Sequence, residues 1–152
     1  MTTPTLKARL RTDLTTSMKA RDELRSATIR MALSAITNEE VAGKVARELS
    51  DDEVLKVLGR EVKKRKEAAE AFAGAGRAEQ AAREEAEGEV LSAYLPAQLS
   101  DEELQGLVTA AVAETGAEGP RGMGAVMKVL TPRIAGRADG SRVAAAVKSA
   151  LS

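Results

Sequence analysis

Carboxylates are the side chains of this sequence best suited to acid–base or metal chemistry, because several occur in close pairs. Either use requires carboxylates that converge on one buried point. Glu84 and Glu87 could share a helix face, but the ferritin-like di-iron pattern also needs Glu-x-x-His motifs, and the sequence has no His. We therefore interpret the acids as solvated surface residues and predict no metal site. The pairs are Glu39 and Glu40, Asp51 and Asp52, Glu84 and Glu85, and Glu87 and Glu89.

The sequence also lacks the residues that usually support nucleophilic catalysis or nucleotide binding. Cys is absent, which excludes disulfides, thiolate metal ligands and thiol nucleophiles. Without His, no Ser or Thr has the commonest general base. The glycines of the Gly-Met-Gly segment at 122–124 lack the rest of a phosphate loop, and no strand precedes them. We predict no catalytic residues, no cofactor and a protein that is not an enzyme.

Basic residues are the remaining candidates for a functional surface, because they are grouped along the chain. The net charge is zero, with 23 basic and 23 acidic residues. Residues 54–66 nevertheless hold six basic and one acidic side chain, and so do residues 120–152, whereas residues 67–103 hold two basic and ten acidic ones. Gathered positive charge attracts phosphates, because each contact releases counterions. The candidates are Arg121, Lys128, Arg133, Arg137, Arg142 and Lys148, together with Lys63, Lys64, Arg65 and Lys66.

An alternative interpretation is that both basic groups are solvated helix faces, with Glu67 and Glu70 neutralising the run at 63–66. The sequence pI of about 6.4 lies well below the value above about 9 that is typical of a basic binding domain. Phe72 and Tyr94 are the only aromatic residues, which argues against single-strand binding by base stacking. Any RNA bound here would be recognised through its backbone and shape.

The elements that must position these residues are all predicted to be helices, because apolar residues recur at spacings of three and four. Thr3 and Pro4 indicate a first helix start, and Asp22 a second. Capping boxes of Ser50 with Glu53 and Ser100 with Glu103 indicate two further starts. At each of these two starts, an apolar residue before the cap can pack against one in the first helical turn as a hydrophobic staple. These residues are Leu49 with Val54 and Leu99 with Leu104. Inward-facing residues are expected at Leu6, Leu10, Leu14, Ile29, Leu33, Ile36, Val54, Leu55, Leu58 and Val62.

Pro96 divides the predicted elements, because proline biases the preceding residue away from helix. The helix that follows Gly74 and Gly76 is expected from about Ala78 to Tyr94, with Ala82, Ala86, Val90 and Leu91 inward. Three shorter helices are expected after Pro96. The predicted fold is all-α, with an N-terminal bundle of about four helices in residues 1–95 and a small three-helix domain in residues 96–152. The first of these three helices carries apolar residues from Leu104 to Val112 and is expected to end at Gly116. The second carries apolar residues from Met123 to Leu130. The third follows Asp139 and carries apolar residues from Val143 to Leu151.

The stretch GMGAVMKVLTPRIAGRADG at 122–140 is predicted to contain the start of a helix near two glycines. A missing Cβ at Gly122 and Gly124 would allow close backbone approach. Met123, Val126, Met127 and Leu130 fit one helical face, which leaves Lys128 facing solvent. A helix packed closely on a neighbour accounts for this pattern without any ligand, and Met127 would then belong to the core.

These segments resemble those of the free-standing YqeY-like proteins, which are related to the tail domain of GatB, the B subunit of the tRNA-dependent amidotransferase. The similar segments are residues 30–40, 49–77, 93–104 and 122–143. Within the last of them, Gly124, Val126, Met127 and Lys128, then Gly136, Ala138 and Asp139, match the pattern shared with that tail. Four residues of this motif are candidates either for maintaining the fold or for a function of their own: Gly124, Met127, Gly136 and Asp139.

The resemblance implies that the chain helps to hold tRNA or another structured RNA while chemistry occurs elsewhere. By transfer, Lys128, Arg133, Arg137 and Arg142 are expected to contact the RNA backbone. Carbon–nitrogen ligase activity with glutamine as amido-nitrogen donor would belong to the full enzyme, so this chain would at most be an accessory to it.

A protein-interaction module without RNA binding is the alternative, in which the acidic block docks a basic partner surface. The apolar runs are too short to span a bilayer, and MTTPTLKARLRTDL has no long apolar stretch typical of a signal peptide. We therefore expect a cytoplasmic protein without a membrane partner.

Overall fold

Local capping residues define where most helices of this chain begin. The computed structural model describes residues 3–152, and the described chain is helical without strands. Ser50 and Ser100 each close the expected capping box with Glu53 and Glu103, and Asp22 caps the second helix through the Arg25 N–H. The elements are α1 (Leu6–Lys19), α2 (Glu23–Glu40), α3 (Asp51–Gly74), α4 (Ala78–Ser92), α5 (Asp101–Thr115), the 3₁₀ turn η1 (Pro120–Gly122), α6 (Met123–Ile134) and α7 (Gly140–Leu151).

The first helix start was predicted two residues too early. Thr5 is the N-cap of α1, and its hydroxyl accepts the Ala8 N–H at 3.1 Å. The Leu6 N–H is satisfied by Asp51 Oδ1 at 3.0 Å, so a residue 45 positions away helps to fix this end. Thr3 and Pro4 precede the helix. Asp51, the first residue of α3, therefore stabilises the start of α1 through its carboxylate.

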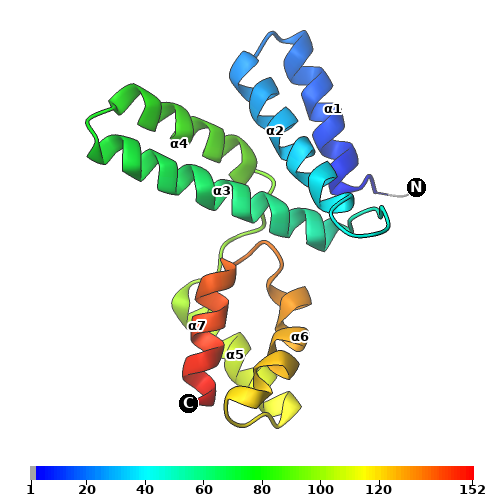
Figure 1. Ribbon diagram of the computed structural model, residues 1–152, viewed down its shortest axis with the longest axis vertical. Coiled ribbons are helices and arrows are strands. Elements are labelled where there is room, and N and C mark those ends of the chain that lie inside the picture. Colours follow the sequence, from blue (N-terminus) through cyan, green and yellow to red (C-terminus); the bar gives the residue numbers. More distant parts are fainter. Residues whose placement is uncertain (1–2) are drawn as a thin grey trace. The chain divides into compact units, whose positions relative to one another are not determined.

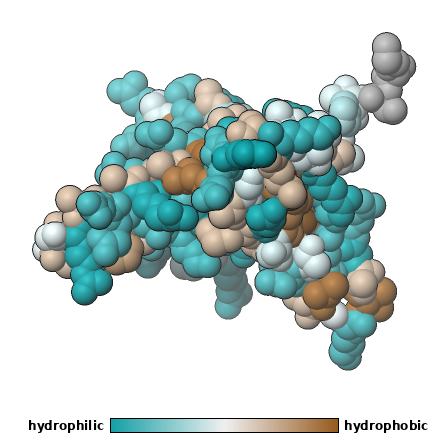
Figure 2. All heavy atoms as spheres, turned by 90° about the horizontal axis from the view of Figure 1, so that it is seen from above, coloured by the Kyte–Doolittle hydropathy of each residue, from teal (hydrophilic) through white to brown (hydrophobic). Residues whose placement is uncertain are grey.

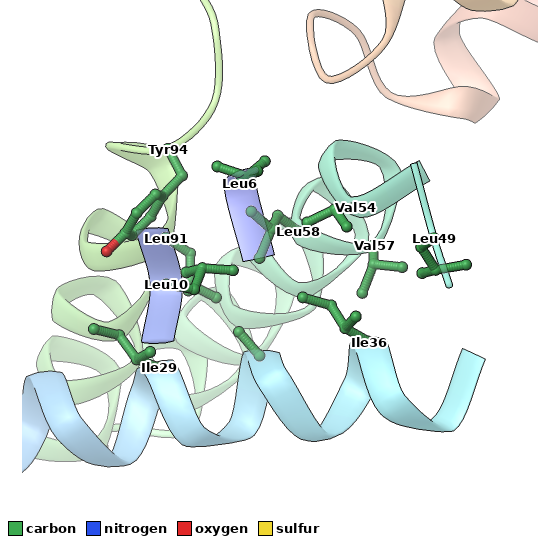
Figure 3. Packing of buried hydrophobic residues seen from close by; sticks show 11 residues of the cluster. Leu6, Leu10, Ile29, Ile36, Leu49, Val54, Val57, Leu58, Leu91 and Tyr94 are labelled. Atoms are coloured by element: carbon green, nitrogen blue, oxygen red, sulfur yellow. The ribbon is translucent and has the colours of Figure 1, made fainter. Parts of the chain in front are cut away.

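The chain divides between Leu95 and Pro96 into two compact units. In unit 1, which ends at Leu95, α1 pairs with α2 and α3 pairs with α4 as antiparallel hairpins (Figure 1). The core of unit 1 lies where these hairpins meet, as the packed side chains in Figure 3 show. Its largest fully buried members are Leu10, Ile29, Ile36, Val54, Leu58 and Leu91.

Glu40 joins the ends of three segments in unit 1. Its carboxylate accepts two hydrogen bonds from Lys7 Nζ, at 2.8 and 2.9 Å, and one from the Leu49 N–H at 3.1 Å. Lys7 first, and then the Leu49 N–H, lower the pKa of Glu40 below its usual value. Glu40 is buried, so the interpretation of every paired acid as a solvated surface residue is wrong here.

Tyr94, near the end of unit 1, contacts two residues of α1. Its ring is buried in the core (Figure 3), its hydroxyl donates to Asp13 Oδ2, and the Arg9 guanidinium lies 5.6 Å from the ring centroid. Burial, and then the Asp13 carboxylate, raise the pKa of Tyr94 to about 12. The helix α4 ends at Ser92, two residues before the predicted end.

Glu53 makes the start of α3 sensitive to acid. Its carboxylate pairs with Arg47 and accepts the Ser50 N–H, and these contacts lower the pKa of Glu53 from 4.5 to about 2. Because the unfolded chain binds the proton of the Glu53 carboxyl more tightly than the folded chain does, the stabilisation is complete above the ordinary pKa of 4.5. It is lost as the pH falls towards about 2.

We expect Glu53→Gln to flatten the dependence of Tm on pH in this window, measured by circular dichroism. Glu67→Gln, an exposed carboxylate of the same helix, should retain the wild-type slope, and equal slopes for all three proteins would contradict this assignment.

Unit 2, which begins at Pro96, encloses a hydrophobic core of its own. Its fully buried members are Val108, Ala111, Val126, Leu130, Val143 and Val147, and α5 contacts both α6 and α7. Gly116 ends α5 in the left-handed conformation, with φ of 65°. Asp139 caps α7 through the Ser141 N–H at 3.2 Å. These ends agree with the sequence prediction.

Candidate nucleic-acid interface

The motif at 136–142 is built into the fold of unit 2. Gly136 has φ of 71°, a conformation that strongly favours glycine. The Arg137 carbonyl accepts the Leu99 N–H at 2.8 Å, and Arg137 Nε donates to the Ala97 carbonyl at 3.2 Å. The turn before α7 therefore holds the segment that enters α5. Gly136 and Asp139, named as motif residues, act structurally in this turn.

Arg142 completes the same attachment. Its Nη2 donates to the Leu99 carbonyl at 3.2 Å and to Asp101 Oδ1 at 2.8 Å. Arg133 Nη2 forms a comparable pair across the unit, with the two carboxylate oxygens of Glu114 at 3.1 and 2.8 Å. Three of the six predicted cations of the tail, including Arg137, are thus held by groups of unit 2.

The other three tail cations are exposed and make no hydrogen bond or ion pair with the described part of the chain. Arg121 lies in η1, Lys128 in α6 and Lys148 in α7. Residues 96–152 as a whole hold six basic and six acidic side chains. Five of those acids lie between Asp101 and Glu118, before the first of the cations. The positive charge of unit 2 is therefore concentrated on η1, α6 and α7.

The two glycines at the start of α6 differ in whether the surrounding structure has room for a larger side chain. A Cβ added to Gly122 would lie 2.6 Å from the Ala117 Cβ, so this position requires glycine unless the backbone shifts. A Cβ at Gly124 meets nothing within 4 Å, and the expected close approach is therefore wrong at that residue. Met127 is half-buried and packs against the core of unit 2, as its structural interpretation predicted. Lys128 faces solvent.

The basic run at 63–66 does not form one surface. Arg65 is only 6% exposed, and its guanidinium lies between Glu61 Oε1 at 3.4 Å and Glu87 Oε2 at 3.5 Å. The prediction that Arg65 contacts RNA is therefore wrong, because a phosphate cannot reach it. Lys64 and Lys66 are exposed, and Lys63 is half-buried.

The burial of Glu87 against Arg65 also explains an error in the predicted face of α4. Ala81 and Leu91 are buried together with Glu87, whereas Ala82, predicted to point inward, is exposed. Gly88 lies on the same side, where an added Cβ would be 3.8 Å from the Arg65 Cβ. A carboxylate occupies the position that an apolar pattern would assign to a hydrophobic residue.

Two hollows of unit 1 lie along α2, and neither was predicted from the sequence. The larger, of about 450 Å³, lies between α2 and α3 and is lined by Ala35, Asn38, Glu39, Val57, Arg60, Glu61 and Lys64. The second, of about 380 Å³, is lined by Arg30, Leu33, Ser34, Thr37 and Asn38. The available sequence signal was the helical spacing of Arg30, Ser34, Thr37 and Asn38, which places them on one face of α2.

The described residues show neither a metal cluster nor a membrane span. Within 3–152, no three His, Cys, Asp or Glu residues gather in a way that could hold a metal ion. No helix in the same range is long and apolar enough to cross a membrane. The large hydrophobic residues most exposed in unit 1 are Met18, Met31, Val41 and Val45. In the view of Figure 2 the surface is mostly hydrophilic, with small apolar patches between the polar side chains.

Comparison with known proteins identifies the family of this chain, and the matching descriptions name no activity. The family model described as "Yqey-like protein" matches residues 7–151. A curated protein of Schizosaccharomyces pombe, described as "Uncharacterized protein C22F3.15", is 37% identical over 99 residues, which are 64% of this chain and 78% of that protein. Because the family model covers nearly the whole chain, the chain belongs to the YqeY-like family.

Proposed function

We propose that this chain is a non-catalytic accessory protein that binds tRNA or another structured RNA through backbone phosphates. The observation that carries the proposal is that Arg121, Lys128 and Lys148 of η1, α6 and α7 are exposed and have no hydrogen-bond or ion-pair partner among residues 3–152. Cations without protein partners are available to replace the counterions of a phosphate backbone. The likeness of residues 122–143 to the amidotransferase tail supports RNA as the polyanion, and a cytoplasmic location accords with this role.

The aromatic residues support a structured RNA over an unpaired strand. Tyr94 is buried and its hydroxyl is engaged by Asp13, and Phe72 is half-buried. Proteins that bind single strands commonly stack successive bases on exposed aromatic rings, and neither ring of this chain is fully exposed. Recognition through the shape and phosphates of a folded RNA requires no such ring.

Binding to total tRNA at low and high salt tests this proposal. A gel-shift at about 50 mM and about 200 mM salt should show a complex at the lower concentration that weakens strongly at the higher one, because released counterions oppose binding. The absence of a complex at low salt, or a complex that is indifferent to salt, would contradict the proposal.

A protein-interaction module is the second candidate, and the loop between α2 and α3 favours it. Val41 and Val45 of this loop are 58% and 78% exposed, and exposed apolar residues can mark a partner surface. A pull-down from lysate with and without ribonuclease separates the two candidates. Co-purifying RNA that disappears with ribonuclease supports the first, whereas a protein partner that persists after ribonuclease supports the second.

A further inference from the structure

The polar side chains on the outer face of α2 form a hollow without any acidic residue. We call this the α2 hollow, and it is lined by Arg30, Leu33, Ser34, Thr37 and Asn38. The four polar residues lie at positions i, i+4, i+7 and i+8, which repeat on one helix face. All four are exposed, and in the described chain their side chains form no hydrogen bond or ion pair.

This donor set fits an anionic oxygen ligand. A guanidinium, two hydroxyls and an amide can all donate to phosphate oxygens, and the guanidinium can do so with two parallel bonds. From Arg30 to Asn38 the helix rises about 12 Å. The donors are therefore spread over roughly two helical turns. The α2 hollow therefore has room for a short run of backbone.

The two carboxylates that line the neighbouring hollow each have a cationic partner. Asn38 also lines the neighbouring hollow between α2 and α3, where Glu39 pairs with Arg60 at 3.6 Å and Glu61 pairs with Lys64 at 3.4 Å. An anion that enters the α2 hollow therefore meets Arg30 without a competing free carboxylate among the residues that line it.

We propose that the α2 hollow is a second phosphate-binding subsite, which contacts the backbone of the same structured RNA from unit 1. This inference rests on the proposed function and extends it, because unit 1 then contributes affinity of its own.

The test compares Arg30→Gln with Arg77→Gln, its matched control. Arg77, at the N-cap of α4, is an exposed cation that forms no ion pair with the part of unit 1 that the structure describes. With total tRNA and fluorescence anisotropy, Arg30→Gln should weaken binding roughly tenfold at about 0.1 M salt and reduce the slope of log Kd against log salt by about 0.9. Arg77→Gln should leave both quantities at their wild-type values.

A second variant removes hydrogen-bond donors without changing charge. Ser34→Ala/Thr37→Val should weaken tRNA binding several-fold and leave the salt slope unchanged, because no counterion contact is lost. If Arg30→Gln behaves like Arg77→Gln while the wild-type chain binds tRNA, the α2 subsite is refuted and the proposed function stands. If the wild-type chain binds no tRNA, both are refuted.

Discussion

Replacing Arg121, Lys128 and Lys148 together by Gln is expected to lower the affinity for tRNA on the order of a hundredfold at about 0.1 M salt. These cations are exposed and have no partner in the described chain, so each is free to neutralise one phosphate. Losing three such contacts should also reduce the slope of log Kd against log salt by between about 2 and about 3. Anisotropy titrations over a salt series measure both quantities.

The matched control for this triple variant removes the same charge from unit 1. Lys44, Lys56 and Arg77 are likewise exposed and unpaired, and none of them lines the α2 hollow. Their joint replacement by Gln should leave the salt slope near the wild-type value, because long-range charge is screened within about 10 Å at 0.1 M salt. Equal losses in the two triple variants would mean that net charge, and not the surface of η1, α6 and α7, determines binding. Far-ultraviolet circular dichroism of each variant checks that the helices are intact.

The second large effect is expected at Arg65, which we place in the core and not on the RNA surface. Arg65→Met removes the partner of two nearly buried carboxylates, those of Glu61 and Glu87. Removing one member of a buried ion pair costs roughly 3–5 kcal/mol. We expect about 3 kcal/mol here, at the low end of that range, because Arg83 Nε still contacts Glu87 at 3.3 Å.

The double variant Arg65→Met/Glu87→Leu should recover most of this loss, because a hydrophobic pair of similar volume often replaces a buried ion pair without cost. Urea unfolding followed by tyrosine fluorescence measures the effect on unit 1 specifically, since Tyr94 is the only tyrosine and there is no tryptophan. Lys66→Met, at an exposed position of the same helix, should change the free energy of unfolding by less than about 0.5 kcal/mol. A double variant no more stable than Arg65→Met alone would contradict the assignment.

The helix starts could be predicted where the signal lies within four residues. Ser50 with Glu53, Ser100 with Glu103, and Asp139 are of this kind, and the structure confirms each of them. The start of α1 could not be predicted in the same way, because the Leu6 N–H is satisfied by Asp51, which lies far along the chain. A local pattern does not distinguish Thr3 from Thr5 as the cap.

The candidate site was harder to predict than the fold, because it depends on which cations are already engaged. Both Lys128 and Arg133 appear in the sequence as basic residues of the tail. In the structure, Glu114 pairs with Arg133, whereas no residue of the described range pairs with Lys128. Arg65 appears in sequence as one of four consecutive basic residues, and only the packing of α3 on α4 shows that it is buried with Glu87. Burial of an ion pair leaves no apolar signature in the sequence of either helix.

The central claim is that RNA phosphates meet the cations of η1, α6 and α7, and amide chemical shifts of the isotope-labelled full chain test it most directly. On titration with an unlabelled RNA hairpin at low salt, the account predicts shift changes that include the amides around Arg121, Lys128 and Lys148 and that disappear when salt is added. Unchanged amides throughout η1, α6 and α7, with or without changes elsewhere in the chain, would contradict it.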